Sequence, residues 1–127
     1  WGLSLTAFSM SCAAAPPAAE RRFRCIIRNH GPRDGDEVVQ AYHAAVAVGA
    51  VRHPVPRRSL IDFARVSISA GQASTLDFQI ADDQLMLVNQ AGRRVLYPGR
   101  HQVIFSRGHG PELTFDVSVA RSRAIVV

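Results

Sequence analysis

Apolar and polar residues alternate over many short stretches of this chain, which is the pattern of half-buried β-strands. Residues 22–28 show it clearly, because Phe23, Cys25 and Ile27 occupy one face and arginines occupy the other. Residues 74–80 alternate just as strictly. The pattern predicts strands over residues 3–12, 22–28, 37–43, 60–69, 74–80, 85–88, 95–97, 101–106 and 113–119.

Turns separate these strands, and residues 28–42 contain the sharpest one. Asn29 and Asp34 can bond nearby backbone groups, and Gly31 and Gly35 can take a positive φ without steric cost. Further turn signals recur roughly every eight to twelve residues, and no segment shows a convincing helical period. Seven to nine short strands spaced in this way predict an all-β fold, an antiparallel β-sandwich.

Four segments are less regular. Residues 13–20 contain Pro16-Pro17 and are compatible with a loop or an extended edge segment. Residues 44–58 are small and apolar at first and then rich in proline, so we expect a long connection between sheets, whose first half is either a helical turn or an extended loop. Residues 81–84 fit one helical turn or a simple turn. We expect a domain over residues 1–120, with residues 121–127 as a C-terminal tail or junction.

Length and composition indicate one globular domain. The chain has 127 residues, of which 47% are hydrophobic and 20% charged. No apolar run approaches the roughly 20 residues that cross a bilayer, so we expect no membrane span. The sequence opens on Trp1 rather than Met and shows no signal peptide, so we expect a piece of a longer polypeptide.

The net charge of +5 does not indicate a nucleic-acid partner. All 15 basic residues are arginines, and they are scattered in ones and twos among acidic residues. A DNA-binding surface would concentrate them on one helix or face. We therefore interpret them as solvated surface residues and expect no nucleic-acid binding.

The two cysteines lie at positions that a hairpin would bring together. If the segments that flank Pro16-Pro17 pair as antiparallel strands, the centre falls between Ala18 and Ala19, and Cys12 then faces Cys25. Cross-strand distances allow a disulfide, which would persist in an oxidising compartment. The alternative is two free thiols packed as small hydrophobic residues. Two cysteines are too few ligands for a structural zinc site.

No group of residues has the spacing of a catalytic centre. Glycoside hydrolysis needs two carboxyl groups about 5–10 Å apart. The acidic residues instead cluster in turns, where no apolar run would raise a pKa; they are Asp34, Asp36, Glu37, Asp82 and Asp83. No serine lies in a Gly-x-Ser-x-Gly elbow. We therefore expect no catalytic residue in this chain.

The histidines show no metal-ligand spacing, so we expect neither a metal nor another cofactor. We expect His30 and His109 in loops, and His43, His53 and His101 in strands or at the surface.

A carbohydrate-binding surface would need exposed aromatic side chains in one plane. The candidates are Trp1, Tyr42 and Tyr97, which lie far apart in the sequence. Tyr42 falls on the strand face opposite Val39 and Ala41, so we expect it instead to pack on a neighbouring domain.

Residues 29–42 read Asn-x-Gly-x-Arg-Asp-Gly-Asp-Glu-Val-Val-Gln-x-Tyr. This motif resembles the signature of the fibronectin type III-like domain that closes family 3 glycoside hydrolases, the β-glucosidases and β-xylosidases. Other segments keep that family's order: Gly-Leu-Ser-Leu-Thr-x-Phe at 2–8, Pro-x-Arg-x-Leu-x-Asp-Phe-x-Arg-Val at 56–66, Ala-Gly-Gln at 70–72 and Pro-Gly at 98–99. The resemblance covers residues 1–120 and is closer to the β-xylosidase branch. It departs at Asp62 and Ser106, where the family often has glycine.

The resemblance implies an immunoglobulin/fibronectin type III-like β-sandwich that is not itself an enzyme. In such enzymes the nucleophile lies in a Ser-Asp-Trp type motif of the N-terminal barrel, and no Ser-Asp-Trp occurs here. The implied role is to brace the catalytic domains of the same polypeptide, with Trp1 and Tyr42 as candidate inter-domain contacts, in an extracellular or periplasmic enzyme. The alternative is an independent sugar- or protein-binding module of a secreted protein.

Overall fold

The computed structural model describes residues 7–17, 20–48, 58–120 and 123–125. Seven longer strands appear in this part of the chain: β1 (Phe8–Ala15), β2 (Arg22–Asn29), β3 (Gly35–Val48), β4 (Ser59–Ile68), β5 (Ala73–Gln79), β8 (Gly99–Ser106) and β9 (Leu113–Val119). Three short strands and one 3-10 helix complete it: β6 (Leu87–Val88), β7 (Arg94–Leu96), β10 (Arg123–Ile125) and η2 (Asp82–Leu85). The predicted all-β antiparallel sandwich is confirmed.

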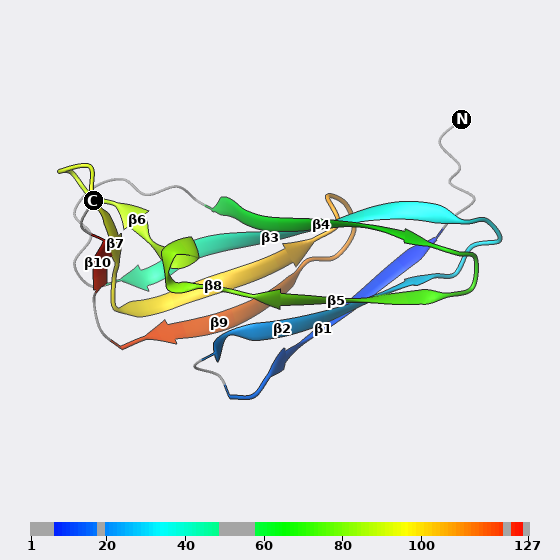
Figure 1. The fold of residues 1–127 in the computed structure, drawn as a ribbon, viewed down its shortest axis with the longest axis horizontal. Helices are drawn as coiled ribbons and strands as arrows, with labels where there is room; N and C mark the ends of the chain where they lie inside the picture. Colours follow the sequence, from blue (N-terminus) through cyan, green and yellow to red (C-terminus); the bar gives the residue numbers. More distant parts are fainter. Residues whose placement is uncertain (1–6, 18–19, 49–57, 121–122, 126–127) are drawn as a thin grey trace.

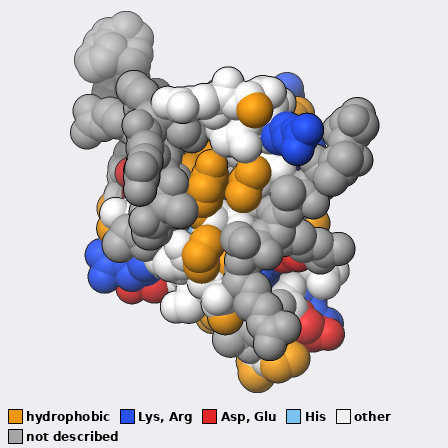
Figure 2. Space-filling view, turned by 90° about the vertical axis from the view of Figure 1, so that its left-hand side faces the viewer, with side chains coloured by type: hydrophobic (Ala, Val, Ile, Leu, Met, Phe, Trp, Pro, Cys, Tyr) orange, Lys and Arg blue, Asp and Glu red, His pale blue; other side chains and the backbone are white. Residues whose placement is uncertain are grey.

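The strands form two large sheets and one small one. The first large sheet has the order β1-β2-β5 and the second β4-β3-β8-β9, and all neighbouring strands are antiparallel. Figure 1 shows the longer strands running along the molecule, with β6, β7 and β10 gathered at one end. Figure 2 looks at this end and shows hydrophobic side chains in the middle of it, with charged side chains nearer the rim.

Phe105 on β8 holds the two large sheets together. It is fully buried, and its ring centroid lies 5.4 Å from that of Phe23 on β2 and 5.2 Å from that of Phe78 on β5. The ring of Phe115 on β9 completes the cluster, with its centroid 5.9 Å from that of Phe105. Tilted and edge-on aromatic contacts of this kind add to the area that the rings bury. The core therefore forms where the sequence pattern places the inward side chains.

The strand pattern is confirmed best where alternation is strict. On β2 the odd-numbered positions from Phe23 to Asn29 are buried and the even-numbered ones are exposed. On β8 the alternate residues His101, Val103 and Phe105 are all fully buried.

The prediction of a connection over residues 44–58 is wrong in its first part. β3 continues to Val48, because Ala44 and the residues after it pair with β8 down to the contact of Val48 with Gly99. A run of small residues has no alternation to reveal a strand, yet its backbone can still complete the ladder. Residues 49–57 lie outside the described part of the chain.

Two other segments take one of the forms that the sequence left open. Residues 13–15 extend β1 as an edge strand, and residues 82–85 form the 3-10 turn η2. Part of the segment 121–127, which we expected as a tail or junction, forms β10 and pairs with β7.

Phe105→Ala should lower the free energy of unfolding by about 3–5 kcal/mol, because it removes a fully buried ring from the contact between the sheets. The matched control is Phe63→Ala on β4, whose side chain is 64% exposed and should cost well under about 1 kcal/mol. Urea denaturation followed by far-UV circular dichroism measures both. Equal losses in the two variants would contradict this core.

Candidate functional site

The turn after β2 is organised by Asn29, which is fully buried. Its backbone N–H donates to the Gln72 carbonyl (2.8 Å), and its backbone carbonyl accepts from the Gly71 N–H (3.0 Å). The side-chain Nδ2 donates to the carbonyls of Ile68 (3.0 Å) and Arg33 (2.7 Å). The side-chain Oδ1 accepts from the Gly31 N–H (2.9 Å). The predicted local bond is thus present, and the amide also reaches β4 in the other sheet. Neither Gly31 nor Gly35 takes a positive φ, although both could do so without steric cost. The Asn29 side chain closes this turn instead.

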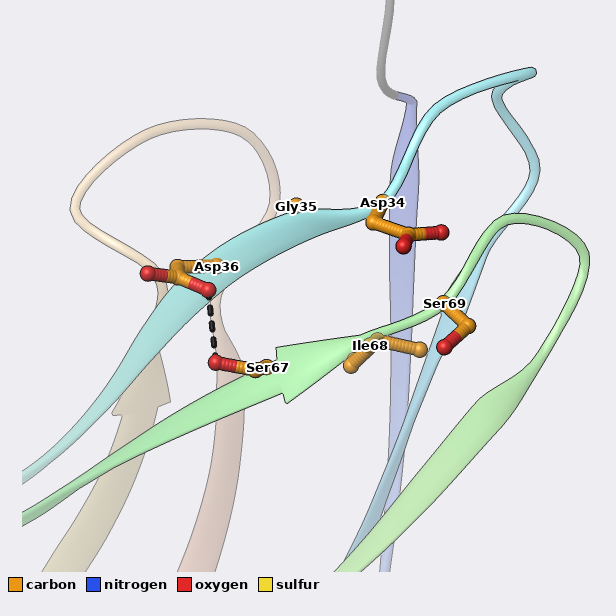
Figure 3. A pocket seen from close by; sticks show the side chains of 6 residues that line it. All are labelled: Asp34, Gly35, Asp36, Ser67, Ile68 and Ser69. Atoms are coloured by element: carbon orange, nitrogen blue, oxygen red, sulfur yellow. Dashed lines mark hydrogen bonds between the residues drawn. The ribbon is translucent and has the colours of Figure 1, made fainter.

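A shallow hollow lies beside this turn, lined by Asp34, Gly35, Asp36, Ser67, Ile68 and Ser69 (Figure 3). Asp36 accepts hydrogen bonds from Ser67 Oγ (2.6 Å) and from the Arg65 guanidinium (2.9 Å). Asp34 accepts one from the Ala70 N–H (2.9 Å). The Ser67 hydroxyl, followed by Arg65, holds the pKa of Asp36 below its usual value. A general acid in glycoside hydrolysis needs the opposite shift, so Asp36 is suited to fixing the turn.

Glu37, next to this hollow, points into the molecule and pairs with a buried arginine. Its Oε2 lies 3.1 Å from Arg107 Nη1 and 3.7 Å from His109 Nε2, and its Oε1 accepts from the Val38 N–H. The Glu37 and Arg107 side chains are only 10% and 8% exposed, and Arg107 Nε has no partner among the described residues. This pair was not predicted from the sequence. The phase of β3 could have revealed it, because Glu37 shares the inward series of Val39.

Two histidines form a second buried polar pair. His43 on β3 and His101 on β8 are 3% and 0% exposed, and their rings stack with centroids 5.0 Å apart. His101 Nε2 donates to the Tyr97 carbonyl at 2.8 Å, so its Nδ1 is the acceptor for His43 Nε2 at 2.8 Å. Burial, and then the neighbouring His101, lowers the pKa of His43 to about 4. Burial also lowers the pKa of His101. Both were expected in strands or at the surface, and their burial was not foreseen.

The residues that the sequence singled out lie apart from each other. Cys12 and Cys25 face each other across β1 and β2 and are joined by a disulfide. Tyr42 is half-buried on the outer face of β3, where its hydroxyl donates to Gln40 Oε1 and the Arg58 guanidinium carbon lies 4.4 Å from its ring centroid.

The aromatic platform that a sugar would need is not assembled by the described residues. Tyr97 is 8% exposed and belongs to the buried set, and Trp1 lies outside the described part. In the described ranges, no group of three or more His, Cys, Asp or Glu residues could hold a metal ion. No helix there has the length and apolar character needed to cross a membrane.

The fold and these side chains can be compared with known proteins. The sequence profile of the family described as "Fibronectin type III-like domain" matches residues 37–108, which run from Glu37 on β3 past Ser106 at the end of β8. The chain belongs to the fibronectin type III-like domain family. The resemblance seen in the sequence is therefore confirmed.

The relatives of this fibronectin type III-like domain are family 3 glycoside hydrolases, and the match lies in their C-terminal region. An exo-1,4-β-xylosidase of Aspergillus oryzae is 31% identical over 97 residues, which are 76% of this chain and 12% of that protein. A β-glucosidase structure from Listeria innocua has 25% identity and a TM-score of 0.79, and covers 95% of this chain and 17% of that one. A Kluyveromyces marxianus β-glucosidase shares the fold, with a TM-score of 0.81 at 19% identity, covering 98% of this chain and 15% of that one. The chain spans 12–13% of the length of the curated relatives that it matches.

Arg107→Met should lower the free energy of unfolding by about 3–5 kcal/mol, because it leaves Glu37 buried without its partner. Replacing both residues by Met should recover much of this loss. The control is Arg24→Met, which breaks an exposed pair with Asp77 and should leave the stability almost unchanged. Chemical denaturation at neutral pH measures all three. A double variant no more stable than Arg107→Met would argue against the pair.

The domain should lose stability as the pH falls below about 6.5. The pKa of His43 is about 4 in the folded chain and 6.5 in the unfolded one, so only the unfolded chain takes up a proton in this window. The stability that comes from keeping His43 neutral is fully present above pH 6.5. Roughly 3 kcal/mol of the free energy of unfolding is lost by pH 4. His43→Gln, which keeps a donor toward His101, should flatten the dependence between pH 7.5 and about 5, where carboxylates contribute least. His30→Gln, at an exposed position, serves as the control. If the free energy of unfolding changes with pH as steeply in His43→Gln as in the unmodified chain, the pH dependence arises from another group.

Proposed function

We propose that this chain is a non-catalytic accessory domain of a family 3 glycoside hydrolase acting on β-xylosides or β-glucosides. Its role is to cover apolar surface on the catalytic domains of the same polypeptide and to hold them in register. The observation that carries the proposal is the combination of family and size, because the matched domain makes up only 12–17% of relatives named as xylosidases and glucosidases. The parent protein is then the hydrolase, and the chemistry lies outside these residues.

The described carboxylates support a structural role. Glu37 is paired with Arg107, Asp36 with Ser67 and Arg65, and Asp34 with a backbone N–H. A pair in which one carboxyl is held protonated and the other ionised, as glycoside cleavage requires, is not among these contacts.

The Cys12–Cys25 disulfide is consistent with a protein of an oxidising compartment. It supports the expectation of an extracellular or periplasmic parent enzyme.

The test compares the full-length polypeptide that carries this chain with the 127-residue chain alone. We expect the full-length protein to hydrolyse p-nitrophenyl β-xyloside or β-glucoside, and the chain alone to hydrolyse neither. Binding of the chain to insoluble xylan and cellulose is measured in parallel. Hydrolysis by the chain alone, or a full-length protein that cleaves no β-glycoside, would overturn the proposal. Retention on xylan would favour the independent binding module instead.

A further inference from the structure

The outer faces of the two large sheets differ in chemistry. On β1-β2-β5, arginines at alternate positions of β2 point outward, Arg24 pairs with Asp77, and Ile26 at 41% exposure is the one large apolar side chain prominently exposed among the described residues. On the other sheet, Phe63 and Leu60 are 64% and 51% exposed. Both lie on β4, which is an edge strand. Exposed apolar side chains gathered on one strand mark an interaction surface more often than isolated ones do.

A β-bulge places these two side chains on the same face. In a regular strand, residues three apart point in opposite directions. Here Ala41 pairs with Asp62 but Tyr42 pairs with Leu60, so Ile61 is the extra residue. Leu60 is therefore opposite Tyr42 on the outer face, and Phe63 is opposite Gln40 on that same face. Ile61 packs toward the core.

The bulge is held by a specific side chain. Gln84 of η2 donates from Nε2 to the Ile61 carbonyl at 3.0 Å, and its Oε1 accepts from the Ala81 N–H at 2.8 Å. Bulges are often found where a strand must redirect a side chain. Without this one, Leu60 and Phe63 could not share a face.

We call Leu60, Phe63 and the half-buried Tyr42 the β4 patch. Ion pairs border it, because Arg58 binds Glu112 and lies over the Tyr42 ring, and Arg65 binds Asp36. An apolar centre with a polar rim is the usual anatomy of a protein interface. Arg58 already occupies the face of Tyr42, which leaves that ring unsuited to stacking on a sugar.

The edge of β4 is less suited to pairing with a further strand. Asp62 Oδ1 accepts the Phe63 backbone N–H at 2.8 Å, so that donor is already used. A charged residue that blocks an edge is a common protection against strand addition. Contact through side chains is the mode that this surface favours.

We infer that the β4 patch is the surface through which this domain packs on another domain of the same polypeptide. The inference rests on the proposed function. Its occupant follows from size, since the curated relatives contain several times more chain than the 12–13% that this domain matches. A tethered neighbour is present at high effective concentration, so a small apolar patch suffices to bind it. Burying Leu60 and Phe63 there removes from water the two most exposed large apolar side chains of the two large sheets, as far as the structure describes them.

Hydrogen–deuterium exchange tests this surface. The peptide covering residues 58–66 is compared between the full-length polypeptide and the 127-residue chain. We expect exchange to be slower in the full-length protein by at least about tenfold. Leu60→Ser with Phe63→Ser should abolish the difference and lower the temperature of thermal inactivation. The control Ile26→Ser, on the other sheet, should change neither. The isolated variants are first shown to unfold like the unmodified chain, so that a folding defect is not mistaken for lost contact.

The outcomes separate this surface from the proposed function. If the full-length protein hydrolyses a β-glycoside but residues 58–66 exchange equally in both forms, the surface is wrong and the function stands. If the peptide is protected in a full-length protein that cleaves no glycoside, the function is wrong and the surface stands. Protection that rises with the concentration of the isolated chain would assign the patch to a second copy and overturn the inference. Protection conferred by soluble xylan on the isolated chain would also overturn it.

Discussion

The fold depends on one buried amide, that of Asn29. The chain crosses from the first sheet to the second after β2 and returns after β4, and both crossings meet at this side chain. Its Nδ2 binds the Ile68 carbonyl at the end of β4, while its backbone N–H binds Gln72 in the next turn. A buried amide with every donor and acceptor paired stabilises one arrangement, because any other would leave polar groups without partners. Asn29 thereby sets how the strands of one sheet are placed against those of the other, and the aromatic cluster around Phe105 fills the space that this creates.

The interior is more polar than a sandwich of this size requires. Glu37 on β3 forms a buried ion pair with Arg107, which directly follows β8. Further along β3, His43 binds His101 on β8. Such pairs contribute little net stability, since desolvation offsets most of their attraction, but each is costly to break. They act mainly on the register of β3 against β8, because a shift by one residue would turn these side chains to the other face and separate the partners. The histidine pair also makes the stability depend on pH, which an apolar core would not do.

The sequence predicts the strands in which apolar and polar residues alternate. It predicts few of the features that lie where this alternation is interrupted. Strict alternation identifies β2 and β5, and the turn residues identify the corner at Asn29. The strand over residues 44–48 was not predicted, because a run of small residues shows no periodic pattern. The bulge at Ile61 was not predicted either, because one extra residue can be recognised only when β4 is paired with β3. Glu37 and His43 could have been recognised as buried from the phase of Val39 and Ala41. Their partners could not, since Arg107 and His101 are distant in sequence.

The β-bulge in β4 fits the proposed role as an accessory domain. A regular β4 would alternate Leu60 and Phe63 between the core and solvent, and the sandwich would present a largely polar exterior on both faces. The inserted residue, held by Gln84, instead exposes two large apolar side chains side by side on an edge strand. That arrangement raises the risk of aggregation for an isolated domain, and the partial blocking of the edge by Asp62 only reduces it. A sequence keeps such a surface at low cost when a neighbouring domain covers it, so the bulge is consistent with the proposed role of a brace.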